Sequence, residues 1–166
     1  GFFCTVLKKN THGEEKRLFK KNKHELFTEL KAKEKEVFSK WLSDLENSAI
    51  IKFKDDYLLT NTLAIDFINK YSNLYFKKVG TTIGTVIKND VIPNHDLALS
   101  IHKSNDINSF ECTLEEAILF LKKENVKIES ENGWILISYK GFGLGWIKQL
   151  GNRFNNYLPN EFRILK

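Results

Sequence analysis

The segment Lys148–Tyr157 contains the residue types that proteins use to contact nucleic acid. It combines two cations, Lys148 and Arg153, with several amide side chains and two aromatic rings, directly after a glycine-rich stretch. Guanidinium and amide groups hydrogen-bond base edges and phosphates, and aromatic rings stack on unpaired bases. The alternative is a polar loop whose asparagines stabilise turns, and composition alone does not separate the two interpretations.

The glycine-rich stretch Gly141-Phe142-Gly143-Leu144-Gly145 lacks the G-x-G-x-x-G spacing of a dinucleotide fingerprint, and the chain has no G-K-[ST] phosphate loop. Alternating glycines remove side chains from one face of a strand, so another backbone or a ligand can approach it. We therefore expect tight packing of this strand. A nucleotide phosphate or base against it is the second interpretation.

The histidines and cysteines do not form a recognisable reactive site. His95 and His102 lie seven residues apart, so they can share a helix face, and Cys112 follows them. A zinc site needs further ligands at matching spacing, and the sequence shows none, so we expect structural hydrogen bonds instead. Neither Cys4 nor Cys112 has an identifiable base beside it, so neither is predicted to act as a nucleophile.

Composition predicts a folded protein, and the distribution of its charge gives weak support to a polyanion partner. Hydrophobic residues make up 42% of the 166 residues, enough for a buried core, and the formal net charge is +5. Residues 134–166 contain five basic residues against one acidic residue, interleaved with tryptophan and tyrosine, which favours a nucleic-acid partner. A lysine-rich surface without such a role is the alternative. No uncharged apolar run approaches about 18 residues, so no membrane-spanning helix is predicted.

Hydrophobic spacing predicts short helices and strands in mixed order. We expect a strand over Phe2–Lys8, a charged linker after it, and a hairpin over residues 50–60. Residues 25–45 are expected to form an amphipathic helix, either continuous or broken near Lys33, where the apolar spacing lapses. Asn61 or Thr62 can cap a short helix, and strands are expected over Leu74–Val79 and Thr82–Ile87.

Further along, Asn94 is a predicted helix cap, and Thr113 with Glu116 forms a capping box before another helix. Residues 134–139 and 142–147 are predicted strands joined by a turn at Lys140-Gly141. The predicted strands and helices do not alternate as βαβ units, which indicates an α+β fold with a small barrel at its C-terminal end.

Several motifs are shared with one known family. Residues 133–139 (GWILISY), 144–148 (LGWIK) and 151–159 (GNRFNNYLP) resemble the C-terminal signature G-W-x-L-V-x-Y, L-G-W-x-K, G-x-x-K-N-x-Y-P-K of RsmF-type RNA methyltransferases. These belong to the Nop/Sun family of RNA cytosine-5 methyltransferases. Residues 93–99 (PNHDLAL), 108–113 (NSFECT) and 1–9 (GFFCTVLKK) are similar to further motifs of the same family.

The resemblance implies an organisation in four parts: residues 1–9 as the last strand of a methyltransferase domain, a linker over 10–24, a small helical and hairpin module over 25–72, and a PUA-like RNA-binding module over 73–166. The family's catalytic cysteines and S-adenosylmethionine-binding strands lie upstream of the motif matching residue 1. We therefore expect a fragment with no cofactor, metal or catalytic residue of its own, although S-adenosylmethionine is expected for the full-length parent.

The implied function is to position small-subunit ribosomal RNA for the methyltransferase, as a cytoplasmic monomer with no membrane contact. The residues predicted to bind RNA are Lys140, Lys148, Asn152, Arg153, Asn155, Asn156 and Tyr157. Asn155 and Asn160-Glu161 replace basic positions of the family signature, which weakens the expected phosphate affinity. The alternative function is a protein-interaction or structural module with no RNA contact of its own.

Overall fold

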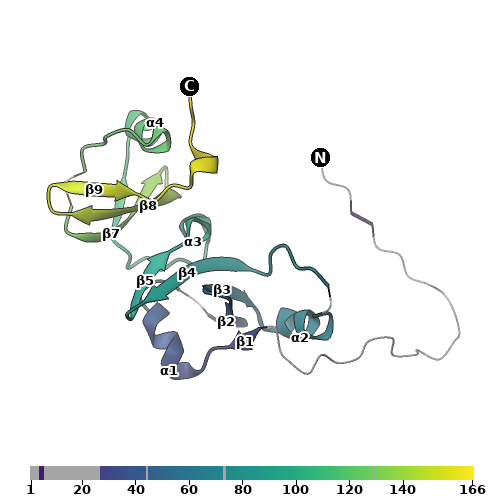
Figure 1. Cartoon of the computed structure of the whole chain (residues 1–166). Coiled ribbons are helices and arrows are strands. Elements are labelled where there is room, and N and C mark those ends of the chain that lie inside the picture. Colours follow the sequence, from purple (N-terminus) through teal and green to yellow (C-terminus); the bar gives the residue numbers. More distant parts are fainter. Residues whose placement is uncertain (1–3, 6–26, 44, 73, 129) are drawn as a thin grey trace, which may run out of the picture.

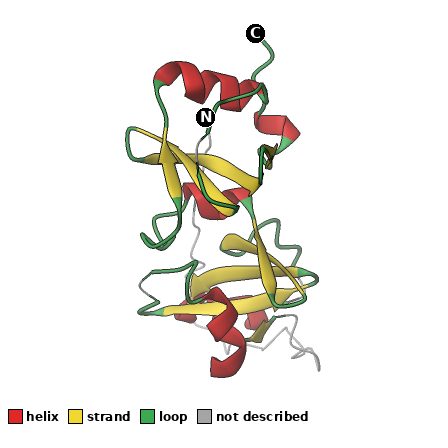
Figure 2. Cartoon of the chain, turned by 90° about the vertical axis from the view of Figure 1, so that its left-hand side faces the viewer, coloured by secondary structure: helices red, strands yellow, loops and turns green. Residues whose placement is uncertain are grey.

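The computed structural model describes residues 4–5, 27–43, 45–72, 74–128 and 130–166. These residues form two β-sheets with short helices, one of five strands and one of four. The sheets lie one above the other, and a short helix lies between them (Figures 1 and 2). The predicted α+β class is therefore confirmed.

The first sheet is antiparallel in the order β1-β2-β3-β4-β5. Its strands are β1 (Thr28–Glu29), β2 (Ser48–Phe53), β3 (Asp56–Asn61), β4 (Thr81–Ile87) and β5 (Asp90–Pro93). The accompanying helices are α1 (Ala32–Lys35), the 3-10 turn η1 (Glu36–Phe38) and α2 (Thr62–Lys70). Helix α2 begins as predicted at Asn61, whose side chain accepts a hydrogen bond from the Leu63 N–H at 2.8 Å.

The second sheet has the order β6-β7-β8-β9, with β6 parallel to β7 and the other pairs antiparallel. Its strands are β6 (Ser109–Glu111), β7 (Gly133–Tyr139), β8 (Phe142–Leu150) and β9 (Arg153–Asn156), followed by the 3-10 turn η2 (Asn160–Phe162). Helix α4 (Leu114–Lys122) covers one face, and it begins with the predicted capping box of Thr113 and Glu116.

A β-bulge shifts the register of the β7–β8 hairpin. Ser138 pairs with Gly143 near the turn, but Ile137 pairs with Gly145, so Leu144 is an extra residue. In a regular two-residue hairpin Ile137 would pair with Leu144. Here it pairs with Gly145, and every later pair of the two strands is shifted by the same one residue. Trp134 consequently pairs with Lys148.

Helix α3 (His95–Leu99) and Trp146 join the two sheets. Trp146 is 1% exposed, its indole N–H donates to the Asn94 carbonyl at 2.8 Å, and its ring meets Trp41 edge-on at 5.7 Å. Asn94 also caps α3, as predicted, by accepting from the Asp96 N–H. One buried cluster contains Ile50 of the first sheet, Leu97 of α3 and Trp146 of the second sheet, so the two sheets share a core.

Two predicted elements are wrong. Residues 25–45 do not form one helix: Thr28–Glu29 pair with β2, and among the described residues of this range only Ala32–Phe38 are helical, as α1 and η1. Burial of Phe27 against Phe53 and of Leu30 in the shared core follows from strand pairing here, and this tertiary context overrides local helical spacing. Residues 74–79 form no strand, because β4 already occupies the edge of β3.

The predicted N-terminal parts are described only in Cys4 and Thr5, which are exposed and not in a strand. The rest of the predicted strand over 2–8, and the predicted linker over 10–24, lie outside the described residues. The predicted limit between residues 72 and 73 falls within the first sheet, since β3 and β4 on either side of it are hydrogen-bonded neighbours.

Candidate nucleic-acid interface

Three neighbouring strands bring an aromatic ring, a cation and an amide side by side. Trp134 on β7 pairs with Lys148 on β8, and Lys148 pairs with Asn155 on β9. Paired residues project from the same face of a sheet. The Lys148 ammonium lies 5.3 Å from the centre of the Trp134 ring, a cation–π contact, and Tyr157 meets the same ring edge-on at 4.5 Å. We call Trp134, Lys148, Asn155 and Tyr157 the Trp134 row.

The opposite face of this sheet is closed. Ile135, Ile137 and Ile147 point into the cluster that contains Phe120 of α4. Strand alternation therefore leaves the Trp134 row on the face that is free of α4. On the same face as the Trp134 row, Leu136 and Trp146 pack in the shared core. The row therefore lies at the edge of the interface between the two sheets.

Arg153 and Asn152 lie beside the row, at the β8–β9 turn, and both are exposed. Gly151 takes the left-handed φ of +65° that the turn requires, and its carbonyl accepts from the Gln149 side chain at 2.7 Å. Arg153 and Asn152 line a second hollow of about 480 Å³, away from the ring of Trp134.

The structure does not bring the other two predicted residues into this group. Lys140 lies in the β7–β8 turn, at the opposite end of β8 from Lys148. Six steps of strand, from Phe142 to Lys148, separate the turn from Lys148 by roughly 20 Å. The Asn156 side chain donates to the Phe120 carbonyl at 2.9 Å and accepts from the Leu158 N–H at 2.8 Å, so both ends of its amide stabilise the fold.

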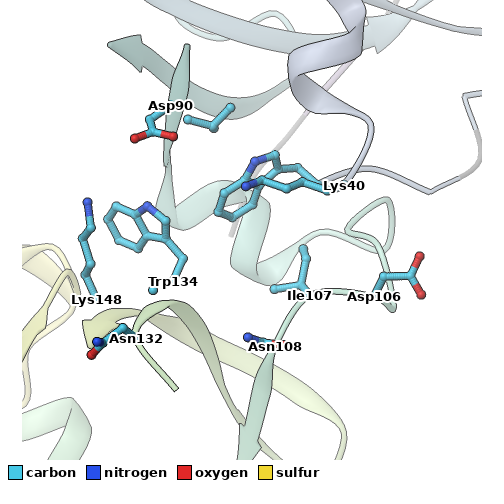
Figure 3. Close-up of a pocket in the computed structure, with 11 residues that line it drawn as sticks. Lys40, Asp90, Asp106, Ile107, Asn108, Asn132, Trp134 and Lys148 are labelled. Carbon is cyan, nitrogen blue, oxygen red and sulfur yellow. The ribbon is translucent and has the colours of Figure 1, made fainter. Parts of the chain in front are cut away.

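A hollow of about 360 Å³ opens beside the Trp134 row, between the two sheets (Figure 3). Residues from both sheets and their connections line it: Lys40, Trp41, Asp90, Val91, Asp106, Ile107, Asn108, Asn132, Gly133, Trp134 and Lys148. Sequence reasoning did not predict Lys40, Asp90 or Asn108 here. They are far from Lys148 in the chain, and no local spacing signals their proximity.

The glycine-rich stretch packs against protein, but not in the predicted manner. A Cβ at Gly143 would collide with the backbone carbonyl of Ala98 in α3, whereas one at Gly145 would meet the Phe120 ring of α4. Because the bulge lies between them, the two glycines serve opposite faces of the sheet instead of stripping one face. The expectation of tight packing is confirmed.

His95 and Cys112 are enclosed by the fold, although the expected hydrogen bond is missing at the buried His95 Nδ1, which has no partner among the described residues. His95 is buried, its ring lies 4.6 Å from that of Phe162, and burial lowers the pKa of its imidazole below the ordinary value. Cys112 is also buried, its thiol donates to the Ser138 carbonyl at 2.9 Å, and burial raises its pKa. Within the described ranges, no three His, Cys, Asp or Glu residues gather as a metal site would require. In the same ranges, no helix is long and apolar enough to cross a membrane.

The second sheet and α4 together form a PUA-like β module. Residues 107–164 match the family model described as the methyltransferase RsmF PUA domain. This range contains β6 to β9, α4 and η2.

The chain is similar to proteins named ribosomal RNA small subunit methyltransferase F. The protein from Vibrio parahaemolyticus is 26% identical over 97% of this chain, and that from Shewanella piezotolerans is 29% identical over 58% of it. These matches span 36% and 20% of the two relatives, so the chain corresponds to a fraction of their length. The resemblance to RsmF-type methyltransferases is therefore confirmed.

Proposed function

We propose that this chain is a non-catalytic RNA-binding region of an S-adenosylmethionine-dependent ribosomal RNA cytosine-5 methyltransferase. Its role is to position small-subunit ribosomal RNA for 5-methylcytosine formation. The cofactor belongs to the full-length parent, and monomeric state and cytoplasmic location are part of the same proposal. The names of the relatives support the substrate class, and the match to the PUA family supports the binding role.

The Trp134 row is the observation that carries this proposal. It offers a ring for an unpaired base, an ammonium for a phosphate and an amide for a base edge on one face of three strands. In the described part of the chain, the ion pairs are Lys35–Glu29 and Lys78–Asp96, so Lys148 and Arg153 have no carboxylate partner there. Their charges are therefore available to phosphates.

The salt dependence of RNA binding tests the proposal. If Lys148 and Arg153 each neutralise one phosphate, the double variant Lys148→Ala/Arg153→Ala should flatten the slope of log K against log[salt] by roughly 1.4 to 1.8, for single- and double-stranded contacts respectively. Filter binding of small-subunit ribosomal RNA fragments at several salt concentrations measures this slope. Thermal melts should stay nearly unchanged, within about 0.5 kcal/mol, because Arg153 is exposed and Lys148 is only partly buried.

Lys140→Ala is the control for the single variant Lys148→Ala, because each removes one positive charge from the same hairpin and Lys140 lies at the opposite end of it. We expect it to leave the slope unchanged. A double variant with an unchanged slope and normal melting removes these two residues from the binding surface.

One observation favours a protein-interaction module as the second candidate. On α2, the side chains of Leu63 and Phe67 are 81% and 56% exposed, an apolar surface away from the second sheet. An apolar protein interface responds little to salt, so a flat slope for a bound partner supports this alternative.

A further inference from the structure

The hollow between the two sheets has an apolar floor and a polar rim. Trp41 and Val91 are buried in the floor, and Ile107 and Trp134 are partly buried beside them. The exposed polar residues of the rim are Lys40, Asp90, Asp106, Asn108 and Asn132. An apolar surface with a few polar groups around it is the usual construction of a small-ligand site.

The size of the hollow limits what it can hold. Its volume of about 360 Å³ lies at the low end of the roughly 300–1,000 Å³ typical of ligand sites. A duplex segment does not fit such a space, but one base with its sugar does. Figure 3 shows Lys148 on one side of the Trp134 indole, with Lys40 and Ile107 on the other, so the ring forms a wall of the hollow.

The charges around the hollow are balanced. Lys40 and Lys148 contribute two cations, and Asp90 and Asp106 contribute two carboxylates. A free phosphate would be attracted by the two lysines and repelled by the two aspartates, so its net electrostatic attraction to the hollow is small. A nucleotide suits it better, because its phosphate pairs with an ammonium while an amino group on its base donates to a carboxylate.

We propose that this hollow binds one unpaired nucleotide of the RNA, and that it favours a base with an exocyclic amino group over uracil. The base contacts the Trp134 ring, its amino group donates to Asp90, and its phosphate pairs with Lys148. This inference rests on the proposed RNA-binding function, and it adds a preference among bases to that function.

Fluorescence anisotropy with labelled single-stranded RNA tests the preference. Homopolymers of cytidine, adenosine and uridine, each about eight nucleotides long, match the usual footprint of a single-strand site. We expect the complete chain to bind the cytidine and adenosine oligomers roughly fivefold more tightly than the uridine oligomer, the lower end of the discrimination that a good base contact gives.

Asp90→Asn should reduce this preference to within about twofold, because an amide no longer offers a charged acceptor. Asp55→Asn is the matched control: Asp55 is an exposed carboxylate in the β2–β3 turn, outside the hollow, and its replacement should retain the full preference. Both side chains are exposed, so thermal melts should show that both variants fold normally.

Equal binding of the three oligomers, or an undiminished preference in Asp90→Asn, overturns the assignment of the hollow and leaves the proposed RNA-binding function intact. If no oligomer and no ribosomal RNA fragment binds with a measurable salt slope, the proposed function itself fails, and the inference fails with it.

Discussion

Replacing Trp146 with phenylalanine tests whether the two sheets share one core. The change removes the hydrogen bond from the indole N–H to the Asn94 carbonyl. That carbonyl keeps a second donor, the Leu97 N–H at 3.1 Å, so it is not left unpaired and the loss should be about 1 kcal/mol. The smaller ring also leaves a void against Trp41, which adds roughly 1–2 kcal/mol.

The two contributions predict a loss of roughly 2–3 kcal/mol in the free energy of unfolding. For a chain of this length, about 2–4 °C of melting temperature corresponds to each kcal/mol, so the transition should fall by about 5–10 °C. Circular dichroism melts measure it, and a single transition is expected because residues of both sheets lie in one cluster.

Trp134→Phe is the matched control, because Trp134 is only partly buried, and phenylalanine retains a ring against Tyr157. It should cost less than about 1 kcal/mol. Equal losses in the two variants, or a biphasic melt of the Trp146→Phe protein, would refute the shared core.

Three further predictions concern the packing of individual residues. Gly143→Ala should destabilise the fold by roughly 1–3 kcal/mol in denaturant titrations, since the new methyl group displaces the backbone carbonyl of Ala98. Cys112 should react with a thiol reagent only on unfolding, because its buried thiol has a raised pKa, whereas exposed Cys4 should react at once. The pKa of His95 is lowered in the folded state, so the unfolded chain binds the proton more tightly. The contribution of neutral His95 to stability is therefore fully present above pH about 6.5, and it is lost as the pH falls below this value. Chemical denaturation at neutral and acidic pH should show a smaller loss in His95→Gln than in the wild type.

The elements that could be predicted are those encoded by local chemistry. The caps at Asn61, Asn94 and Thr113 depend on side chains within three residues of the helix start, and each was confirmed by its hydrogen bond. The β7–β8 turn at Lys140-Gly141 is equally local and was predicted at its observed position, whereas the β2–β3 turn lies at Lys54-Asp55, one residue before the predicted Asp55-Asp56. A single sequence carries these signals because the interacting atoms are close neighbours in the chain.

The elements that could not be predicted depend on distant partners. The strand at Thr28–Glu29 exists because the edge of β2 is available, which the spacing of apolar residues over 25–45 does not reveal. The composition of residues 148–157 indicated Lys148 and Tyr157 as nucleic-acid contacts, but it did not show that both lie against the Trp134 ring. It did not show that Asn156 serves the backbone of α4, or that Lys40 and Asp90 line the same hollow as Lys148.

The bulge at Leu144 sets the face that each later residue of β8 occupies. If all residues of β8 were present but paired regularly from the turn, Ile147 would lie opposite Trp134 and Lys148 would point toward α4. Such a slip would bury a charge and expose the core together. Deleting Leu144, in contrast, would remove the bulge and leave Lys148 opposite Trp134, because the later residues keep their present partners. In evolutionary terms, the hairpin can lose one residue at this point without changing the pairs beyond it.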